Sequence, residues 1–129
     1  MAGKKYDQEK PPLQLIPPSA LIEEARVMAF GAKKYGVYNW LDGMEWSRLV
    51  GAVMRHVLAW HGGEDLDPET GASHLAHARC CLAMLMGYQE LSIGEDDRYG
   101  TVNHQKLLAR APAQPQPDPS TPLDAPPQT

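Results

Sequence analysis

Ionisable side chains gather near the middle of the chain. Eight of them, including four of the five histidines, fall within 22 consecutive positions: His56, His61, Glu64, Asp65, Asp67, Glu69, His74 and His77. Hard divalent cations prefer oxygen ligands, and Mg²⁺ commonly combines few carboxylates with waters and substrate phosphates. The spacing therefore predicts a divalent-cation site with Glu64, Asp67 and Glu69 as its ligands. A solvated acidic turn without a metal is the alternative.

The histidines that flank this acidic run admit three roles. His74 and His77 are three residues apart on an expected helix, so they project from neighbouring positions of one face. Together with His56 or His61 they could bind zinc, and with His56 this would make the protein a zinc-dependent hydrolase. They could instead orient the carboxylates or hold a phosphate, with His74 or His77 as a proton acceptor. The third role is structural, as histidines bonded to backbone at the edge of the core.

Glu23 and Glu24 form a second acidic pair. Glu24 lies three residues after Leu21 and four before Met28, so it sits nearer the apolar face of the predicted helix. A carboxylate at the edge of a core is costly unless a cation accompanies it. Glu24 is therefore either the partner of a lysine or arginine or a further metal ligand.

The segment from Lys33 to Trp40 carries the groups that a nucleotide pocket needs. Lysines attract phosphate, an amide pairs with a base edge, and an aromatic ring stacks on a base. Lysines near a helix C-terminus also serve as ordinary partners of the helix dipole. Further phosphate candidates lie in the N-terminal arm and on the next helix. The candidate substrate-binding residues are Lys5, Asp7, Lys10, Lys33, Lys34, Tyr35, Asn39, Trp40, Arg48, Arg55 and His56.

Amphipathic helices must position these groups. Ser19 is a good N-cap and Gly36 suits a helix end. The apolar stripe between them consists of Leu21, Ala25, Met28 and Ala32. The predicted helices run from Ser19 to Gly36, from Trp46 to Gly62, from about Ala72 to about Leu91 and, as a short fourth, from Val102 to Ala111. Pro68 and Gly71 predict a loop for the acidic run.

No stretch alternates apolar and polar residues over the length of a strand, so the chain is predicted to be all-α, a helical bundle of three to four helices. Three helices bury little surface in a chain of 129 residues, and we expect oligomerisation with another copy to cover the wide apolar stripes. Residues 1–110 form a single domain, which begins with a Pro-punctuated extended arm over residues 1–18. Residues 111–129 hold seven of the 12 prolines and are expected to be a disordered tail.

The composition of the chain argues against some classes of binding partner. The net charge of −4, with no run of basic residues, argues against long nucleic acid. No window approaches the ~18 apolar residues that a membrane span needs, so we expect a cytoplasmic protein without a membrane partner. Cys80 and Cys81 are neighbours on a predicted helix and point about 100° apart, which argues against a disulfide between them.

Two stretches of the chain together resemble a known family. They read KYDQEKPPLQLIPPSALIEEARVMAFGAKKYGVYNW and RHVLAWHGGEDLDPETGASHLAHA. Their motifs K-Y-D-x-x-K-P, F-G-A-K-K-Y-G-x-x-N-W and G-E-D-x-D-x-E-T-G-x-x-H-L-x-H-A are similar to those of phage and bacterial dATP/dGTP diphosphohydrolases. These proteins in turn resemble the all-α MazG-like nucleotide pyrophosphatases. The resemblance extends from about Lys4 to Tyr88.

The resemblance implies hydrolysis of a purine deoxynucleoside triphosphate, dGTP or dATP, to the monophosphate and pyrophosphate. It also implies Mg²⁺ or Mn²⁺ held by carboxylates between helices. In the MazG pattern an ExxE pair on one helix faces ExxD on the next. Here Glu64 and Asp67 match ExxD in spacing, whereas Glu23 and Glu24 are adjacent.

The roles expected from this chemistry divide the candidate residues into four groups. The metal ligands are Glu64, Asp67 and Glu69, joined by Glu24, and the proton acceptor is a carboxylate or His74 or His77. The residues that stabilise negative charge on the phosphates are Lys33, Lys34 and Arg55. The residues that contact the base and sugar are Asn39 and Trp40. The alternative function is a non-catalytic nucleotide-binding or adaptor protein whose helices serve to dimerise.

Overall fold

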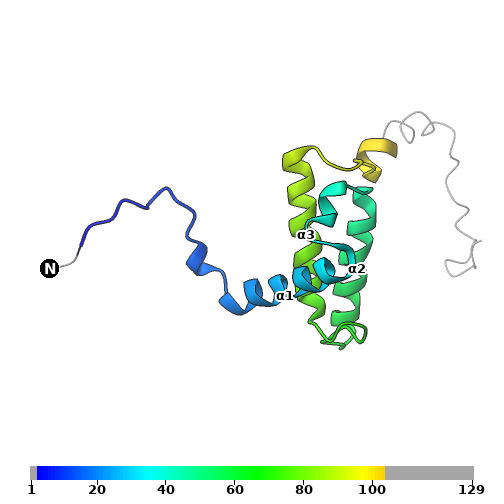
Figure 1. Ribbon diagram of the computed structural model, residues 1–129, viewed down its shortest axis with the longest axis horizontal. Coiled ribbons are helices and arrows are strands. Elements are labelled where there is room, and N and C mark those ends of the chain that lie inside the picture. The colour runs from blue at the N-terminus through cyan, green and yellow to red at the C-terminus, as the bar shows by residue number, and fades with distance from the viewer. Residues whose placement is uncertain (1–2, 104–129) are drawn as a thin grey trace, which may run out of the picture. The chain divides into compact units, whose positions relative to one another are not determined.

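The computed structural model describes residues 3–103, which form helices and turns and no sheet (Figure 1). The three α-helices are α1 (Pro18–Tyr35), α2 (Trp46–His61) and α3 (His74–Leu91). Turns of 3₁₀-helix lie at Leu13–Leu15 and Asn39–Asp42, and a turn of π-helix lies at Tyr99–Asn103. The all-α prediction and all three long helices are confirmed. The α-helices belong to one compact unit that ends at Asp96, and a second unit begins at Asp97.

Helix α1 begins one residue earlier than its predicted cap. Pro17 is the N-cap and makes no side-chain capping bond, so the prediction that Ser19 caps this helix is wrong. Pro18 takes the first helical position because its missing N–H has no intrahelical partner there and its fixed φ suits a helix. At the other end Gly36 has a φ of +102° and donates its N–H to the carbonyl of Ala32. The prediction that this glycine ends the helix is confirmed.

Helix α3 begins at His74, two residues later than predicted, because Ser73 caps it. The Ser73 hydroxyl accepts the backbone N–H groups of Leu75 and Ala76 at 3.1 and 3.4 Å. The cap places His74 in the first turn and His77 one turn further on, both facing inward, with His74 only 4% exposed.

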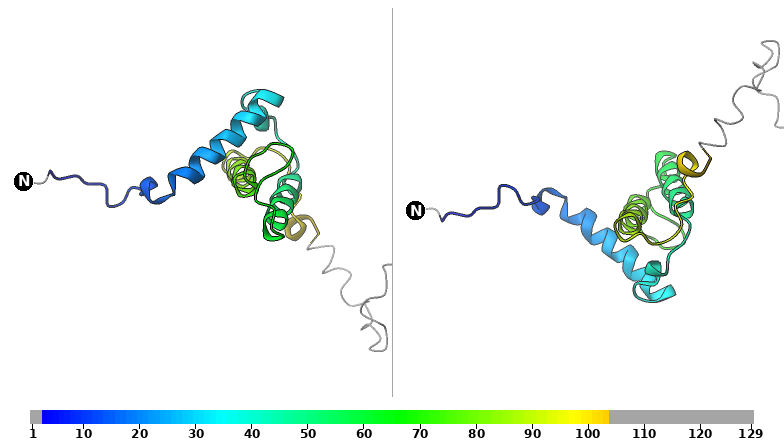
Figure 2. Two further views of the ribbon diagram at one scale, coloured as in Figure 1. Left: turned by 90° about the horizontal axis from the view of Figure 1, so that it is seen from below. Right: turned by 90° about the horizontal axis from the view of Figure 1, so that it is seen from above.

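The core lies in two clusters on α3. Tyr88, fully buried, packs with Leu49 of α2 and Cys81, and its hydroxyl donates to the carbonyl of Trp40 at 2.5 Å. On the other side of α3, Val27 of α1 packs with Ala76 and Cys80. Cys80 and Cys81 are free thiols, as their adjacency predicted. Helix α3 is therefore the central element, with α2 alongside it and α1 laid across it (Figure 2).

The apolar stripe predicted for α1 is buried only in part. Leu21 and Ala25 are exposed, and the buried residue of the helix is Val27, which the predicted stripe omits. The reason is that α1 packs mainly on α3, while its N-terminal half runs past the α2–α3 pair (Figure 2). Large apolar side chains of the other two helices also stay exposed: Val50, Met54, Val57, Leu58, Trp60, Leu75, Leu82 and Met86.

Three remaining predictions concern the ends of the chain and the membrane. The described part of the arm is exposed, including Leu13 and Leu15. Of the predicted fourth helix, Val102 and Asn103 belong to the π-helical turn, and the rest lies outside the described residues, as do the boundary at residue 110 and the tail from 111 onward. None of the helices in residues 3–103 is both long and apolar enough to cross a membrane.

The start of α2 is fastened to the segment that follows α3. Trp46 donates its ring N–H to the carbonyl of Ile93 at 2.9 Å and its backbone N–H to that of Glu95 at 3.0 Å. Gly43 and Gly94 face each other here, and both have positive φ values, +87° and +79°. A Cβ on Gly94 would collide with the carbonyl oxygen of Met44. The close approach therefore needs glycine for space as well as for conformation.

We predict that Gly94→Ala lowers the free energy of unfolding by about 2–4 kcal/mol, since the collision and the positive φ add. Gly31→Ala is the matched control, because a Cβ on this α1 residue meets nothing within 4 Å. That variant should keep or raise stability by up to about 1 kcal/mol. Urea unfolding followed by circular dichroism measures both, and equal stability of the two variants would contradict the prediction.

Candidate active site

The acidic run between α2 and α3 forms a fixed turn. Asp67 Oδ1 accepts the backbone N–H of Glu69 at 2.7 Å and that of Thr70 at 3.4 Å. The backbone N–H of Asp67 donates to the carbonyl of Ala72 at 2.8 Å, and that of Gly71 returns to the carbonyl of Asp67 at 2.7 Å. These bonds fix the direction of the Asp67 carboxylate, whose side chain is only 15% exposed. The run is therefore more than a solvated acidic turn.

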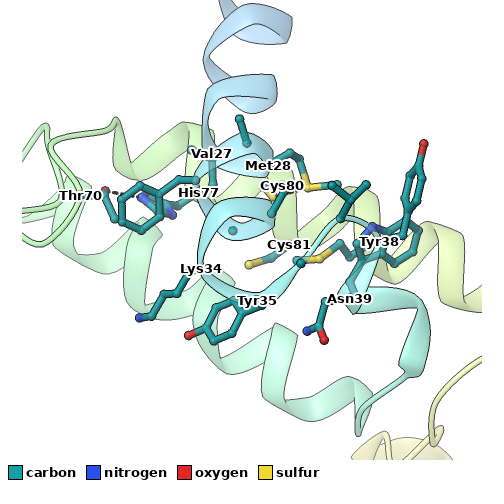
Figure 3. Close-up of a pocket in the computed structure, with 18 of the residues that line it drawn as sticks. Val27, Met28, Lys34, Tyr35, Tyr38, Asn39, Thr70, His77, Cys80 and Cys81 are labelled. Atoms are coloured by element: carbon teal, nitrogen blue, oxygen red, sulfur yellow. Dashed lines mark hydrogen bonds between the residues drawn. The ribbon is translucent and has the colours of Figure 1, made fainter.

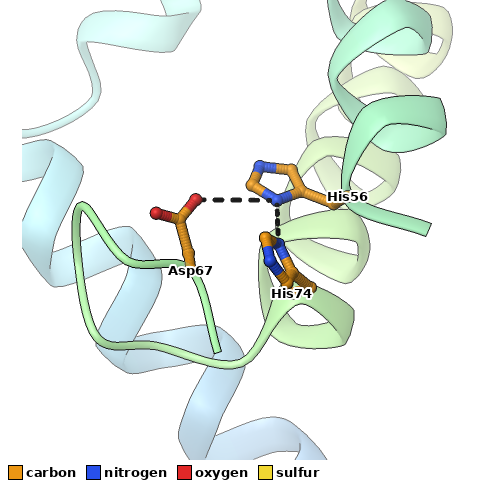
Figure 4. A group of neighbouring side chains, drawn as sticks. All are labelled: His56, Asp67 and His74. Atoms are coloured by element: carbon orange, nitrogen blue, oxygen red, sulfur yellow. Dashed lines mark hydrogen bonds and ion pairs between the residues drawn. The ribbon is translucent and has the colours of Figure 1, made fainter. Parts of the chain in front are cut away.

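Two histidines meet where the turn joins the helices (Figure 4). Nδ1 of His56, from α2, lies 2.9 Å from Nδ1 of His74, at the start of α3. Nε2 of His74 lies 2.6 Å from Oε1 of Glu64, and Oδ2 of Asp67 lies 3.8 Å from Nδ1 of His56. One potential ligand atom each from His56, Asp67 and His74 lie within 4.8 Å of one another. This group, His56, Asp67 and His74, is called the His–Asp cluster below.

His77 extends the cluster by stacking and through a hydroxyl. Its ring lies parallel to that of His56, with centroids 4.5 Å apart and planes at 8°. Its Nε2 lies 2.7 Å from Thr70 Oγ1, which accepts the backbone N–H of Ala72 at 3.2 Å. In the tautomer of His77 that carries its proton on Nδ1, the Thr70 hydroxyl donates to Nε2.

Burial sets the charges of these groups. It lowers the pKa values of His56 and His77 below the usual histidine value, so both rings are neutral at pH 7. Burial would raise the pKa of Asp67, but the backbone bonds from Glu69 and Thr70 and the nearby imidazoles outweigh it and hold that pKa low. His56 and His77 therefore present neutral imidazoles beside the ionised carboxylate of Asp67, which suits a bound cation.

A pocket of about 640 Å³ opens beside the cluster (Figure 3). One side is polar, with His56, Asp67, Glu69, Thr70, His77 and Lys34. The rest is aromatic, apolar and sulfur-rich, with Val27, Met28, Phe30, Tyr35, Tyr38, Asn39, Trp40, Met44, Cys80, Cys81 and Met84. Figure 3 shows Thr70 and His77 on one side and Tyr38 and Asn39 on the other. Ligand pockets of small molecules span about 300–1,000 Å³, so this one is large enough for a small-molecule ligand.

The structure brings most of the predicted site residues together. Eight of them line the pocket, namely Lys34, Tyr35, Asn39, Trp40, His56, Asp67, Glu69 and His77. His74 belongs to the His–Asp cluster, and Glu64 contacts the cluster through its hydrogen bond to His74. Lys34 Nζ lies 3.8 Å from Glu69 Oε1, an exposed pair that links the end of α1 to the turn.

Other predicted site residues lie elsewhere. Lys33, Arg48, Arg55 and the arm residues Lys5, Asp7 and Lys10 do not line the pocket and are exposed. Glu24 accepts from the Arg79 guanidinium at 3.0 Å. It thus has the arginine partner that was one of its two expected roles, and it is absent from the His–Asp cluster.

Several site residues had no predicted role. Thr70 follows Asp67 by three residues, a spacing at which a hydroxyl commonly bonds within an aspartate-centred turn, and that spacing could have found it. Val27, Cys80 and Met84 line the pocket because α1 crosses α3 there, and a helix crossing leaves no trace in local spacing. Arg79 pairs with Glu24 because α1 and α3 are in contact, and the spacing of residues in the sequence does not show this contact.

The fold and the site define an all-α protein with a histidine and carboxylate cluster beside a pocket large enough for a small-molecule ligand. A family model described as dATP/dGTP diphosphohydrolase, N-terminal, matches residues 1–98, and the chain belongs to this family. It is 40% identical over 128 residues to a protein of Salmonella phage PMBT28 named dATP/dGTP diphosphohydrolase. The match covers 98% of this chain and 44% of that relative, so the chain spans less than half of the relative's length. No solved structure matches. The predicted family is confirmed, and the link to MazG-like enzymes stays a prediction.

Proposed function

We propose that this chain binds a purine deoxynucleoside triphosphate, dGTP or dATP, and hydrolyses it to the monophosphate and pyrophosphate with a divalent cation. The observation that carries the proposal is the placement of the aromatic pocket directly beside the His–Asp cluster. The name of the phage relative, dATP/dGTP diphosphohydrolase, supports the substrate class. The expected compartment is the cytoplasm, in keeping with the free thiols of Cys80 and Cys81.

The two sides of the pocket suit the two ends of a nucleotide. Trp40 and Tyr38 offer rings on which a purine can stack, and the exposed Asn39 amide offers a donor and an acceptor for the base edge. Lys34, at the C-terminal end of α1, lies on the side of Asp67 and His77 and can pair with the phosphates. In this orientation the triphosphate extends from the apolar part of the pocket toward the cluster.

The family resemblance implies Mg²⁺ or Mn²⁺, and the donor set can be weighed against both. The His–Asp cluster offers two imidazole nitrogens and one carboxylate oxygen, which fits Mn²⁺ and other transition metals better than Mg²⁺, an ion that prefers oxygen ligands. A divalent cation, when bound, neutralises the triphosphate and polarises its phosphorus–oxygen bonds.

The chain's own residues would act on the phosphates and the attacking water. Lys34 stabilises negative charge on the phosphates during displacement at the α-phosphorus. His77 is neutral and accepts the proton of the attacking water at Nε2 through Thr70, whose hydroxyl passes its own proton on as it takes up the new one. Glu64 holds the His74 ring in place through Nε2. Pyrophosphate leaves on the far side of the α-phosphorus.

We further propose that two copies associate through the exposed apolar faces of α2 and α3. Leu82 and Met86 lie four residues apart on α3 and are 48% and 72% exposed, and Trp60 and Val57 add to the apolar surface of α2. A monomeric soluble protein rarely leaves so many large apolar side chains in water. A second copy would cover them.

The reaction predicts a specific product pattern. Incubation of the full chain with each of the four deoxynucleoside triphosphates, with Mn²⁺, Mg²⁺ or chelator, should give monophosphate and pyrophosphate from a purine nucleotide only when a cation is present. Ion-exchange chromatography identifies the products. Nucleoside plus triphosphate would mean a different hydrolase, and binding of dGTP without turnover would favour the adaptor function.

The pocket predicts that Lys34→Gln lowers kcat/KM for the purine nucleotide by about tenfold to a hundredfold, because a charged phosphate contact is lost. Lys33→Gln is the matched control. It removes the same charge from the neighbouring residue, which does not line the pocket. Steady-state kinetics on both variants make the comparison, and an equal loss in the two would remove Lys34 from the substrate site.

The apolar face predicts self-association that a charge abolishes. Light scattering should give twice the mass of one chain for the natural protein and the mass of one chain for Leu82→Glu, since a charge cannot be buried there unpaired. Ala25→Glu adds the same charge at an exposed position of α1, outside the proposed contact, and should leave the dimer intact. A natural protein that stays monomeric at high concentration would contradict the proposal.

A further inference from the structure

We infer that His56, His74 and Asp67 bind a transition-metal ion directly, and that Glu64 is the outer partner of His74 and does not contact the ion. The inference deepens the proposed function and rests on it only for the use to which the ion is put. The geometry alone carries the assignment of the ligands. It differs from the sequence expectation, which placed Glu64, Asp67 and Glu69 around an ion with oxygen ligands.

The distance between the two histidines suits a shared ion. Their Nδ1 atoms lie 2.9 Å apart. Two nitrogens that each stand about 2.1 Å from one metal at roughly a right angle are about 3.0 Å apart. Oδ2 of Asp67, 3.8 Å from His56 Nδ1, corresponds to a wider angle of about 130° at the same ion. The ligand atoms of all three residues lie within 4.8 Å of one another, so the side chains can close around one ion by adjusting their positions and leave its remaining positions open.

The Asp67 carboxylate divides its two oxygens between structure and binding. Oδ1 is used by the turn, where it accepts from the backbone of Glu69 and Thr70. Oδ2 carries no such backbone bond and lies on the side of His56 (Figure 4). The turn thus holds one oxygen in place toward the imidazoles before any ion arrives, which reduces the entropy lost on binding.

Glu64 sets the protonation of His74. Its carboxylate can only accept, so the proton of the 2.6 Å bond sits on His74 Nε2 and leaves a lone pair on Nδ1. A histidine ligand whose other nitrogen donates to a carboxylate is the usual arrangement around protein-bound metals. The 54% exposure of the Glu64 side chain, against 5% for His74, places the carboxylate on the solvent side of the ring.

His56 must change tautomer when the ion binds. Without an ion, its Nδ1 carries the proton that His74 Nδ1 accepts. Binding through Nδ1 moves that proton to Nε2 of the same ring, so no proton needs to leave the protein. The parallel stack of His56 on His77, with centroids 4.5 Å apart, keeps the ring in its plane during this change.

Two imidazoles and one carboxylate select the kind of ion. Imidazole suits zinc, copper, iron and nickel, whereas Mg²⁺ requires oxygen ligands and gives up its waters reluctantly. Affinity of such a site is expected to rise from Mn²⁺ through Co²⁺, with Zn²⁺ also tight. Three protein ligands with open positions are also typical of catalytic sites, where the substrate or water completes the shell.

Cobalt binding tests the assignment without using activity. The full chain is treated with chelator and titrated with Co²⁺ while the visible absorption is recorded. Binding of Zn²⁺, Mn²⁺ and Mg²⁺ is then measured by calorimetry. We expect one Co²⁺ per chain with an absorption band typical of nitrogen ligands, displaced by Zn²⁺ and unaffected by a hundredfold excess of Mg²⁺. Absence of the band, or equal competition by Mg²⁺, would overturn the inference.

Variants separate the ligands from the outer partner. His56→Ala and Asp67→Asn should abolish the cobalt band, and His61→Ala, which alters an exposed histidine outside the cluster, should preserve it. Glu64→Ala should weaken affinity by about tenfold to a hundredfold and keep the band at saturation, because an orienting partner is lost and a ligand is not. Loss of the band in Glu64→Ala at saturating Co²⁺ would make Glu64 a ligand and overturn the inference. Circular dichroism confirms that each variant is folded.

The metal site and the proposed reaction fail in different ways. Full hydrolysis of a purine nucleotide by His56→Ala in the presence of Mg²⁺ would overturn the metal site and leave the reaction standing. Normal cobalt binding by a natural protein that hydrolyses none of the four deoxynucleoside triphosphates would support the metal site and contradict the reaction.

Discussion

The contact between His56 and His74 depends on where α3 begins. His74 can reach His56 only if it occupies the first turn of α3, and the Ser73 cap fixes that start. The turn around Asp67 then closes the chain back on itself, since the backbone of Asp67 bonds to Ala72 and that of His74 bonds to Asp65. A shift of one residue in the start of α3 would rotate His74 by about 100° and separate the two imidazoles.

The pocket exists because the three helices are not packed as a closed bundle. Helix α1 contacts α3 through Val27, Ala76 and Cys80, whereas α2 contacts α3 through Leu49, Cys81 and Tyr88. The two core clusters lie on different sides of α3, and Trp40, in the segment between α1 and α2, packs against the second of them. The space between α1 and α2 is left to the pocket. The same open arrangement leaves the apolar surface that we assign to a second copy.

The local sequence pattern predicted the helices well, because each helix has apolar residues at helical spacing and residues at its ends that favour a helix terminus. Gly36 ends α1 as predicted, while Pro18 displaced Ser19 from the cap because proline is favoured at the first helical position. The apolar stripe of α1 was predicted from spacing alone. In its N-terminal half Glu24 bonds to Arg79 of α3, whereas Leu21 is exposed, and Val27 is the buried residue of the helix.

The sequence predicted many of the residues that lie together at the candidate site, but it did not predict which contacts each of them makes. The density of ionisable groups identified Glu64, Asp67 and both histidines of α3, and the motif of lysine, asparagine and tryptophan identified the pocket wall. Roles depend on which atoms face each other. Asp67 and Glu69 are two residues apart, yet one is held beside His56 and the other is exposed beside Lys34. No spacing rule separates them, because the difference arises from a turn of a few backbone hydrogen bonds.

The pair formed by Lys34 and Glu69 connects the two halves of the site. Its atoms are 3.8 Å apart and both side chains are largely exposed, so water screens the pair and it contributes little to stability. A phosphate carries more charge than one carboxylate and accepts more hydrogen bonds, so it can take Lys34 from Glu69 at little cost. Before that exchange the carboxylate offsets the positive charge of the lysine. In the proposed reaction, a phosphate that pairs with Lys34 would free Glu69, which belongs to the same turn as Asp67.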